Sequence, residues 1–201
     1  MSLSKPTARA AEHHGPVHWA WLPHARGLLA DPSARAWLAR QLGLDPDALP
    51  LTRDARGRPH LGTPVASYDC SWSHSGEGLL VALAEGVRLG VDSERLHARP
   101  RALELAQRYF TAAEHDWLAT FAVGPSRDRA FLRLWCAKEA VLKAHGHGLS
   151  FGLHRLRFEA HDNRLRLVAC DPPLGRAEDW SLHEFEPAVD YVAALAWHPH
   201  R

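Results

Sequence analysis

Three short runs of strand-forming residues between positions 68 and 92 constrain the fold of this 201-residue sequence more than any other part. The runs are YDCSWS (68–73), LLVALA (79–84) and VRLGVD (87–92), and the glycine-containing turns HSGEG and EG separate them. Turns this short join neighbouring antiparallel strands. The segment therefore predicts an antiparallel meander.

Helical patterns alternate with these and further strands. Residues 33–44 and 129–146 repeat apolar side chains at helical spacing, and Thr111 with Glu114 forms a capping box that starts another helix. Other strands are predicted at 17–22, 153–160, 164–170, 180–186 and 190–197, and an exposed loop at 53–62. The chain thus predicts an α+β fold of two similar halves, each with helical segments and a run of strands.

The predicted halves span residues 17–95 and 96–201. Residues 1–16 are polar and small, which predicts a flexible N-terminal arm without the apolar stretch of a secretory signal. Three cysteines without a CxxC pair form no disulfide framework. The longest apolar runs, 79–84 and 191–197, are far shorter than the roughly 20 residues of a membrane-spanning helix. We therefore expect a cytoplasmic protein that does not enter a membrane.

The charge balance bears on the partners of the chain. Its 24 lysines and arginines face 23 acidic residues, which gives a formal net charge of +1. A nucleic-acid binder would need its arginines to form one patch despite this near-neutral total. We therefore expect no nucleic-acid partner. Nucleic-acid binding is the least favoured of three functional interpretations.

Two carboxylates share one face of the strand predicted at 87–94. Asp92 and Glu94 are two residues apart, so their Cα atoms lie about 7 Å from each other on the same side. Carboxylates at this spacing can reach one hard cation together. A solvated strand end gives the same pattern, and the motif alone favours that simpler interpretation.

One lysine interrupts the apolar pattern of the helix predicted at 129–146. Lys138 falls at the centre of an arc formed by Phe131, Leu134, Trp135, Val141, Leu142 and His145. An unpaired charge buried there would cost several kcal/mol, so the pattern predicts an anion that faces Lys138. Glu139 and Lys143 lie one turn apart on the rim of this arc. In isolation they indicate a surface ion pair, and beside Lys138 they indicate an interface site.

A histidine and two serines occupy the turn SHSG (73–76). Such a turn can present hydroxyl, imidazole and backbone N–H groups to a phosphate without disturbing the strands, although a polar turn without a ligand looks the same. The sequence has no GxGxxG, GxxxxGK[ST], HExxH or GxSxG pattern. The Rossmann, P-loop, zincin and hydrolase interpretations therefore lack their usual motifs.

Five motifs follow one another between positions 57 and 150. They are GRP (57–59), CSWSHSG (70–76), LGVDSE (89–94), RYFTAAE (108–114) and LWCAKEAVLKAHGHGLS (134–150). In this order they resemble the 4'-phosphopantetheinyl transferases, and among these the monomeric surfactin-synthetase-type branch. The resemblance extends over residues 53–158.

The resemblance implies a fold and a reaction. The fold has two α+β halves in a pseudo-twofold arrangement, of which the C-terminal one is holo-carrier-protein-synthase-like, with the active site in the cleft between them. The reaction moves 4'-phosphopantetheine from coenzyme A to a serine of an apo acyl or peptidyl carrier protein, depends on Mg²⁺ or Mn²⁺, and releases 3',5'-ADP. The protein would act as a monomer. A carrier-protein or coenzyme A binding protein without turnover, on the same scaffold, is the alternative.

The resemblance also implies roles for single residues. Asp92, Glu94 and Glu139 match the metal-binding acids, and Glu139 also matches the proposed base for the carrier serine. Lys143 and His74 match groups that contact the pyrophosphate. The implied catalytic residues are Glu139, Lys143, His74 and Asp92, and the implied cofactor-binding residues are Arg58, Ser73, His74, Asp92, Lys138, Glu139 and Lys143.

Two departures from the family pattern concern the nucleotide end of coenzyme A. Arg58 stands where many relatives have a lysine that meets a phosphate, and it offers a fork of donors instead of a point charge. The helical segment before the GRP turn is short, so the other basic contacts are not assigned. The candidates are Arg35, Arg40, Arg53 and Arg56. We expect the side chain of Trp72 to pack within the fold and to take no part in the chemistry.

Overall fold

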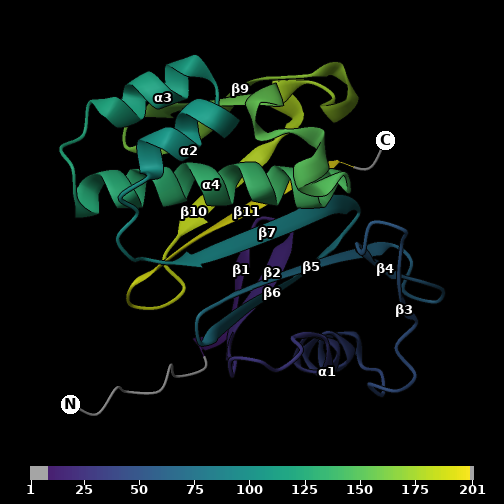
Figure 1. Cartoon of the computed structure of the whole chain (residues 1–201). Coiled ribbons are helices and arrows are strands. Elements are labelled where there is room, and N and C mark those ends of the chain that lie inside the picture. Colours follow the sequence, from purple (N-terminus) through teal and green to yellow (C-terminus); the bar gives the residue numbers. More distant parts are fainter. Residues whose placement is uncertain (1–8, 200–201) are drawn as a thin grey trace, which may run out of the picture.

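The structure, a computed structural model, describes residues 9–199. Its main elements stack as helices, sheet, sheet and helix (Figure 1). The strands are β1 (Arg9–His14), β2 (Val17–Pro23), β3 (Leu51–Arg53), β4 (Pro59–Leu61), β5 (Tyr68–Ser75), β6 (Gly78–Glu85), β7 (Val87–Arg95), β8 (Leu156–His161), β9 (Arg164–Cys170), β10 (Ser181–Phe185) and β11 (Tyr191–Pro199). The helices are α1 (Asp31–Leu42), α2 (Ala102–Tyr109), α3 (Ala112–Ala119) and α4 (Pro125–His145), with 3-10 turns η1 (Gly148–Phe151), η2 (Leu153–Arg155), η3 (Pro172–Leu174) and η4 (Ala177–Asp179).

Strand alternation assigns the apolar side chains to three cores. Successive side chains of a strand point to opposite faces of its sheet. In β6 and in β11 the side chains of both faces are apolar and buried, so each strand has a core on either side. In β6, Leu79, Val81 and Leu83 pack towards α1, and the side chains between them pack towards the second sheet. The inner core also contains Val17, Trp19 and Trp21, which confirms the predicted alternation of β2. The third core lies between α4 and the outer face of β11.

The predicted meander is correct for two of its three strands. β5 pairs with β6 in a sheet of order β1-β2-β6-β5, but β7 pairs with β11 in the sheet β10-β11-β7. Side chains of β5 accept hydrogen bonds from the free edge of β7, because the N–H groups of Leu89 and Val91 donate to Asp69 and Ser71. The strand predicted to complete one sheet thus begins another.

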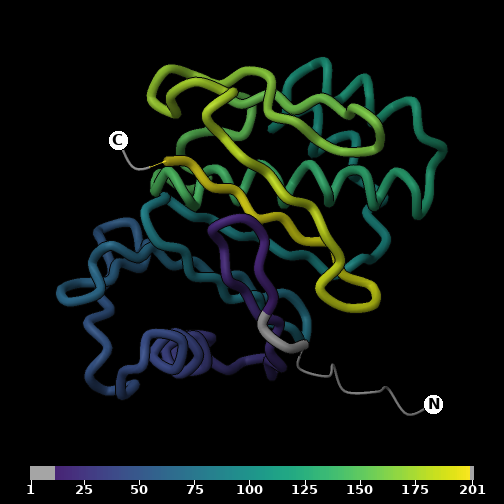
Figure 2. Tube along the Cα trace, turned by 180° about the vertical axis from the view of Figure 1, so that it is seen from behind, coloured from purple at the N-terminus to yellow at the C-terminus, as the bar shows by residue number. Residues whose placement is uncertain are grey.

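The predicted N-terminal arm is partly ordered. Residues 9–14 form β1, which pairs with β2 through His13 opposite His18 and His14 opposite Val17, so this part of the expectation is wrong. The remainder of the arm, residues 1–8, lies outside the described residues. Viewed from behind, the β1–β2 hairpin lies against the C-terminal strands (Figure 2), where the His14 ring stacks on that of His183.

The predicted helices are present. The first begins at Asp31 instead of Ser33, and α3 opens with the predicted capping box, in which Glu114 N–H donates to Thr111 Oγ1 and Thr111 N–H donates to the Glu114 carboxylate. Among the described residues, no helix combines the length and the apolar character that crossing a membrane requires.

Candidate active site

A close backbone approach brings α4 to β7. A Cβ atom built on Gly90 would overlap the carbonyl oxygen of Ala140 and the amide nitrogen of Ala144. Glycine is therefore required where the strand meets the helix. The consequence is that side chains of one face of α4 reach the polar face of β7.

Asp92 is the polar centre of this contact. Lys143 Nζ lies 2.7 Å from Asp92 Oδ1, and Ser73 Oγ donates to the same oxygen at 2.8 Å. The other oxygen, Oδ2, is buried and accepts no hydrogen bond from the described residues. Burial alone would lower the pKa of Lys143, but the charge and hydrogen bond of Asp92, together with the charge of Glu139, outweigh burial and raise that pKa. The lysine is therefore a stable cation.

Two glutamates lie near Asp92. Burial, followed by the charge of Asp92, raises the pKa of Glu139 to about 7 and also raises the pKa of Glu94. Ser75 Oγ donates to Glu94 at 3.1 Å. The structure thus brings Asp92, Glu94, Glu139 and Lys143 into one charged cluster.

The donor chemistry of this cluster fits a hard cation. Mg²⁺ prefers carboxylate oxygens, and the cluster offers three carboxylates that repel one another together with the unpartnered Asp92 Oδ2. In the part of the chain that the structure describes, no group of three His, Cys, Asp or Glu side chains is already arranged as a metal site. Convergence of Asp92, Glu94 and Glu139 on one ion therefore stays a prediction.

Ser73 and His74 lie on opposite faces of β5. Ser73 is buried against Asp92, whereas the exposed His74 lies beside His24, with 4.7 Å between the ring centres. Burial, followed by His74, lowers the pKa of His24. Ser73, His74 and Ser75 belong to β5 and not to a turn, so the expectation that one turn presents them together to a phosphate is wrong.

Lys138 is not part of this cluster. Its side chain is fully buried, and its ammonium lies 2.8 Å from Glu114 Oε1 and donates to the carbonyls of Leu153 and Leu156 at 2.8 and 2.5 Å. The anion predicted to face Lys138 exists, but it belongs to α3. The expectation that Lys138 contacts the cofactor is therefore wrong, because three acceptors of the protein use the three donors of its ammonium.

A cavity of about 260 Å³ opens beside Lys143. Arg53, Arg56, Arg58 and Trp72 line it from the β3–β5 region, and Gly146 lines it from the end of α4. The Arg53 guanidinium stacks over the Trp72 ring at 5.0 Å and pairs with Asp31. Trp72 therefore forms a wall of the cavity, beyond the packing role expected for it.

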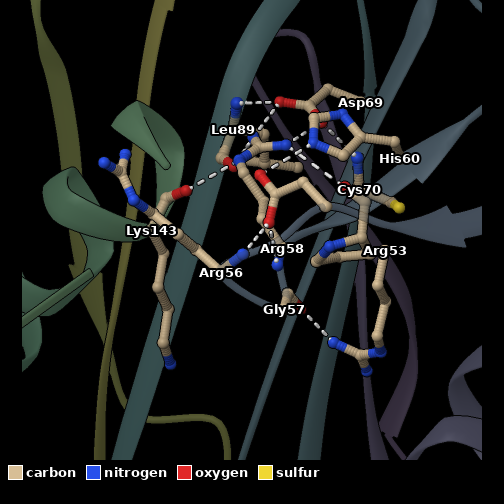
Figure 3. A network of polar contacts seen from close by, with 11 residues as sticks. Arg53, Arg56, Gly57, Arg58, His60, Asp69, Cys70, Leu89 and Lys143 are labelled. Atoms are coloured by element: carbon tan, nitrogen blue, oxygen red, sulfur yellow. Dashed lines mark hydrogen bonds and ion pairs between the residues drawn. The ribbon is translucent and has the colours of Figure 1, made fainter. Parts of the chain in front are cut away.

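Arg58 does not present its charge to this cavity. Its guanidinium pairs with Asp69 at 2.5 Å and donates to backbone carbonyls, including that of Lys143 at 2.9 Å (Figure 3). The expected phosphate contact of Arg58 is therefore not supported. In the described part of the chain no hydrogen bond or ion pair engages the side chain of Arg56, so Arg56 is the available cation of the cavity.

Comparison with known proteins places this arrangement in a family. The profile of the 4'-phosphopantetheinyl transferase superfamily (ACPS) matches residues 88–196. The chain belongs to this superfamily. It is 30% identical over 204 residues to the 4'-phosphopantetheinyl transferase HetI of a Nostoc species, covering 98% of this chain and 80% of HetI. It is also 30% identical over 139 residues to the 4'-phosphopantetheinyl transferase Sfp of Bacillus subtilis, covering 69% of this chain and 59% of Sfp.

Sequence reasoning missed a row of polar residues in this 4'-phosphopantetheinyl transferase relative. Asp69, Ser71, Ser73 and Ser75 alternate along β5, and all four contact β7: Asp69 and Ser71 accept from its backbone, Ser73 donates to Asp92, and Ser75 contacts Glu94 and the Arg95 amide. The signal was present as short hydrogen-bonding side chains at every second position of a strand.

Proposed function

We propose that this chain transfers 4'-phosphopantetheine from coenzyme A to a serine of an apo acyl or peptidyl carrier protein and releases 3',5'-ADP. The observation that carries the proposal is the meeting of Asp92, Glu139 and Lys143 between β7 and α4, beside a cavity, in a member of this superfamily. HetI and Sfp carry the name of this activity.

The cavity beside Lys143 would take the nucleotide end of coenzyme A. Arg56 would contact its phosphates, since its guanidinium is not engaged by the described residues. Arg35, an earlier candidate, donates to the carbonyls of Pro46, Leu49 and Leu51 and is occupied. The diphosphate would then reach Lys143. The contact expected from His74 is not part of this proposal, because its side chain lies on the other face of β5, beside His24.

Asp92, Glu94 and Glu139 would hold Mg²⁺ or Mn²⁺. When bound, the ion supplies positive charge that stabilises the negative oxygens of the diphosphate. Asp92 Oδ2 offers a ligand atom without any rearrangement of its hydrogen bonds, and Ser73 and Ser75 hold the carboxylates of Asp92 and Glu94 from the opposite strand.

Glu139 would act as the general base. Its carboxylate lies in the cluster with Asp92 and Lys143 and can accept the proton of the serine hydroxyl. The serine Oγ forms a bond to the phosphorus on the pantetheine side, its proton passes to Glu139, and the bond to the departing 3',5'-ADP breaks with its electron pair on the ADP oxygen. Lys143, held in place by Asp92, stabilises this charge by fixed placement.

The arrangement of the whole chain belongs to the same proposal. We infer halves at 17–95 and 96–201 in pseudo-twofold relation, with the site between them, and a monomeric cytoplasmic enzyme of the surfactin-synthetase-type branch. Support for a site between the halves comes from the cavity, because residues 53–72 of one half and residues 143–148 of the other line it.

Mass spectrometry of an apo carrier protein tests the proposal. Incubation with the chain, coenzyme A and Mg²⁺ should add one phosphopantetheine group to the carrier. Glu139→Gln should slow the transfer by about 10²–10⁴-fold, the usual contribution of a general base, while Glu159→Gln on an exposed strand position should not. Binding of several carriers without any mass gain would instead support the non-catalytic alternative.

A further inference from the structure

The hydrogen bonds of Arg58 use its whole guanidinium. The group has five N–H donors, and five contacts to oxygen atoms of the protein account for them (Figure 3). They are Nε to Lys143 O at 2.9 Å, one Nη to Pro59 O at 3.2 Å and Asp69 Oδ1 at 3.0 Å, and the other Nη to Asp69 Oδ2 at 2.5 Å and Leu89 O at 3.2 Å. No donor remains for a ligand.

Asp69 is equally occupied. Each of its carboxylate oxygens accepts one hydrogen bond from Arg58 and one from a backbone amide, Cys70 N–H at 3.0 Å or Leu89 N–H at 2.8 Å. The side chains of Arg58 and Asp69 are only 12% and 9% exposed. The Arg58–Asp69 pair is therefore a shielded, bidentate ion pair, the geometry in which such pairs are strongest.

The pair joins the two elements that carry the candidate site. On β7 it holds both the N–H and the C=O of Leu89, the residue before Gly90, where β7 and α4 touch. On α4 it holds the carbonyl of Lys143, one of the last carbonyls of the helix. Such carbonyls have no partner within a helix, and a cation beside them is favourable.

The same two backbones carry the Asp92–Lys143 contact. Asp92 lies three residues beyond Leu89, or about 10 Å along the strand, and the Lys143 ammonium belongs to the residue whose carbonyl Arg58 holds. A Cβ built on Gly146 would lie 3.2 Å from Arg58 Cδ, so the side chain passes tightly against the end of α4. A shift of this helix end would move Lys143 relative to Asp92.

We propose that the Arg58–Asp69 pair is a positioning device, which fixes the last turn of α4 on β7 and so sets the place of Lys143 for the transfer. Arg58 is a positioning residue that does not bind coenzyme A. This inference rests on the proposed function for its kinetic consequences. A lysine at position 58 could not replace the arginine, because an ammonium has three donors and no planar fork.

Arg58→Lys is the decisive variant, because it keeps the charge and removes the fork. We expect kcat to fall by about 10- to 100-fold, the scale of a small misplacement of a catalytic group, while the KM for coenzyme A changes less than about twofold, as for a residue that makes no contact with the substrate. Asp69→Asn should show the same split. Arg101→Lys, at an exposed ion pair, is the matched control and should leave both constants unchanged.

Two measurements without turnover accompany the kinetics. Calorimetric titration with 3',5'-ADP should give the same affinity for Arg58→Lys as for the unmodified chain. Hydrogen exchange of the amides in residues 140–148 should become faster in Arg58→Lys and Asp69→Asn, and not in Arg101→Lys, because the end of α4 loses its support.

The outcomes separate the two proposals. A weaker 3',5'-ADP affinity in Arg58→Lys with an unchanged kcat would overturn the inference and make Arg58 a ligand contact. Unchanged exchange at residues 140–148 in both variants would also overturn it. If the unmodified chain transfers nothing to any carrier, the proposed function fails, and the exchange measurement still decides whether the pair holds α4.

Discussion

Buried charged residues show what the sequence could predict about single side chains and what it could not. The periodicity of residues 129–146 correctly required an anion for Lys138, because an unpaired ammonium in an apolar arc is too costly. It could not identify Glu114, since periodicity shows which face of a helix is buried and not which element packs on it. The same limit applies to Arg58, which was assigned to the cofactor and whose charge is paired instead with Asp69 of β5.

Lys138→Met should destabilise the protein by about 3–5 kcal/mol, the usual cost of breaking a buried pair. The substitution leaves the Glu114 carboxylate, which is 1% exposed, without its cation, and frees the carbonyls of Leu153 and Leu156. The free energy of unfolding from urea denaturation measures the effect, with the exposed Arg101→Met as control. A neutral or stabilised Lys138→Met would show that the pair contributes nothing net.

Individual strands explain both the success and the failure of the predicted meander. Composition and turn length located β5, β6 and β7 well, because these signals are local. The partner of β7 depends on contacts distant in sequence: its edge facing β5 is satisfied by Asp69, Ser71 and Ser75, which leaves the other edge to β11. A row of hydrogen-bonding side chains at alternate positions therefore signals a strand that borders another without pairing with it.

The contact between β1 and β10 should make the fold sensitive to acid. Burial, followed by the charge of His14, lowers the pKa of His183 from 6.5 to about 4. A histidine whose pKa is lower in the folded state binds fewer protons there than in the unfolded chain, so stability falls as the pH drops from about 6.5 towards 4. In His183→Phe the thermal midpoint should fall less between pH 7 and pH 5 than in the unmodified chain.

The exposed His161→Phe serves as the control for this comparison, since its side chain is 71% exposed. It should keep the full acid sensitivity. An identical loss of thermal midpoint in His183→Phe and in the unmodified chain would contradict the assignment to the stacked pair. The phenylalanine keeps the ring contacts that His183 makes with His14 and Phe185, so packing is a small part of the difference.

At the scale of the whole molecule, the sequence predicted the kinds of elements and the residues of the charged cluster, but not the layer order. Strand and helix periodicity place Asp92 with Glu94, and Glu139 with Lys143, on one face each, but the family resemblance was needed to join the four residues in one site. The layers depend on which faces meet, and that is decided by packing between distant segments, such as the three cores on either side of β6 and β11. At Gly90 two such layers come into backbone contact.

Gly90→Ala should therefore separate the helical layer from the sheet beneath it. The added Cβ would overlap backbone atoms of Ala140 and Ala144, which cannot move aside as a flexible side chain can. We expect the unfolding free energy to fall by about 1–3 kcal/mol, the usual cost of overpacking. Transferase activity should also be lost, because Lys143 on α4 moves away from Asp92. Gly62→Ala is the matched control, since its Cβ would meet Pro50 at an ordinary 3.5 Å. Wild-type stability of Gly90→Ala would show that β7 and α4 are not in direct backbone contact. The common site of Asp92, Glu139 and Lys143 depends on this contact, so that result would also contradict the site.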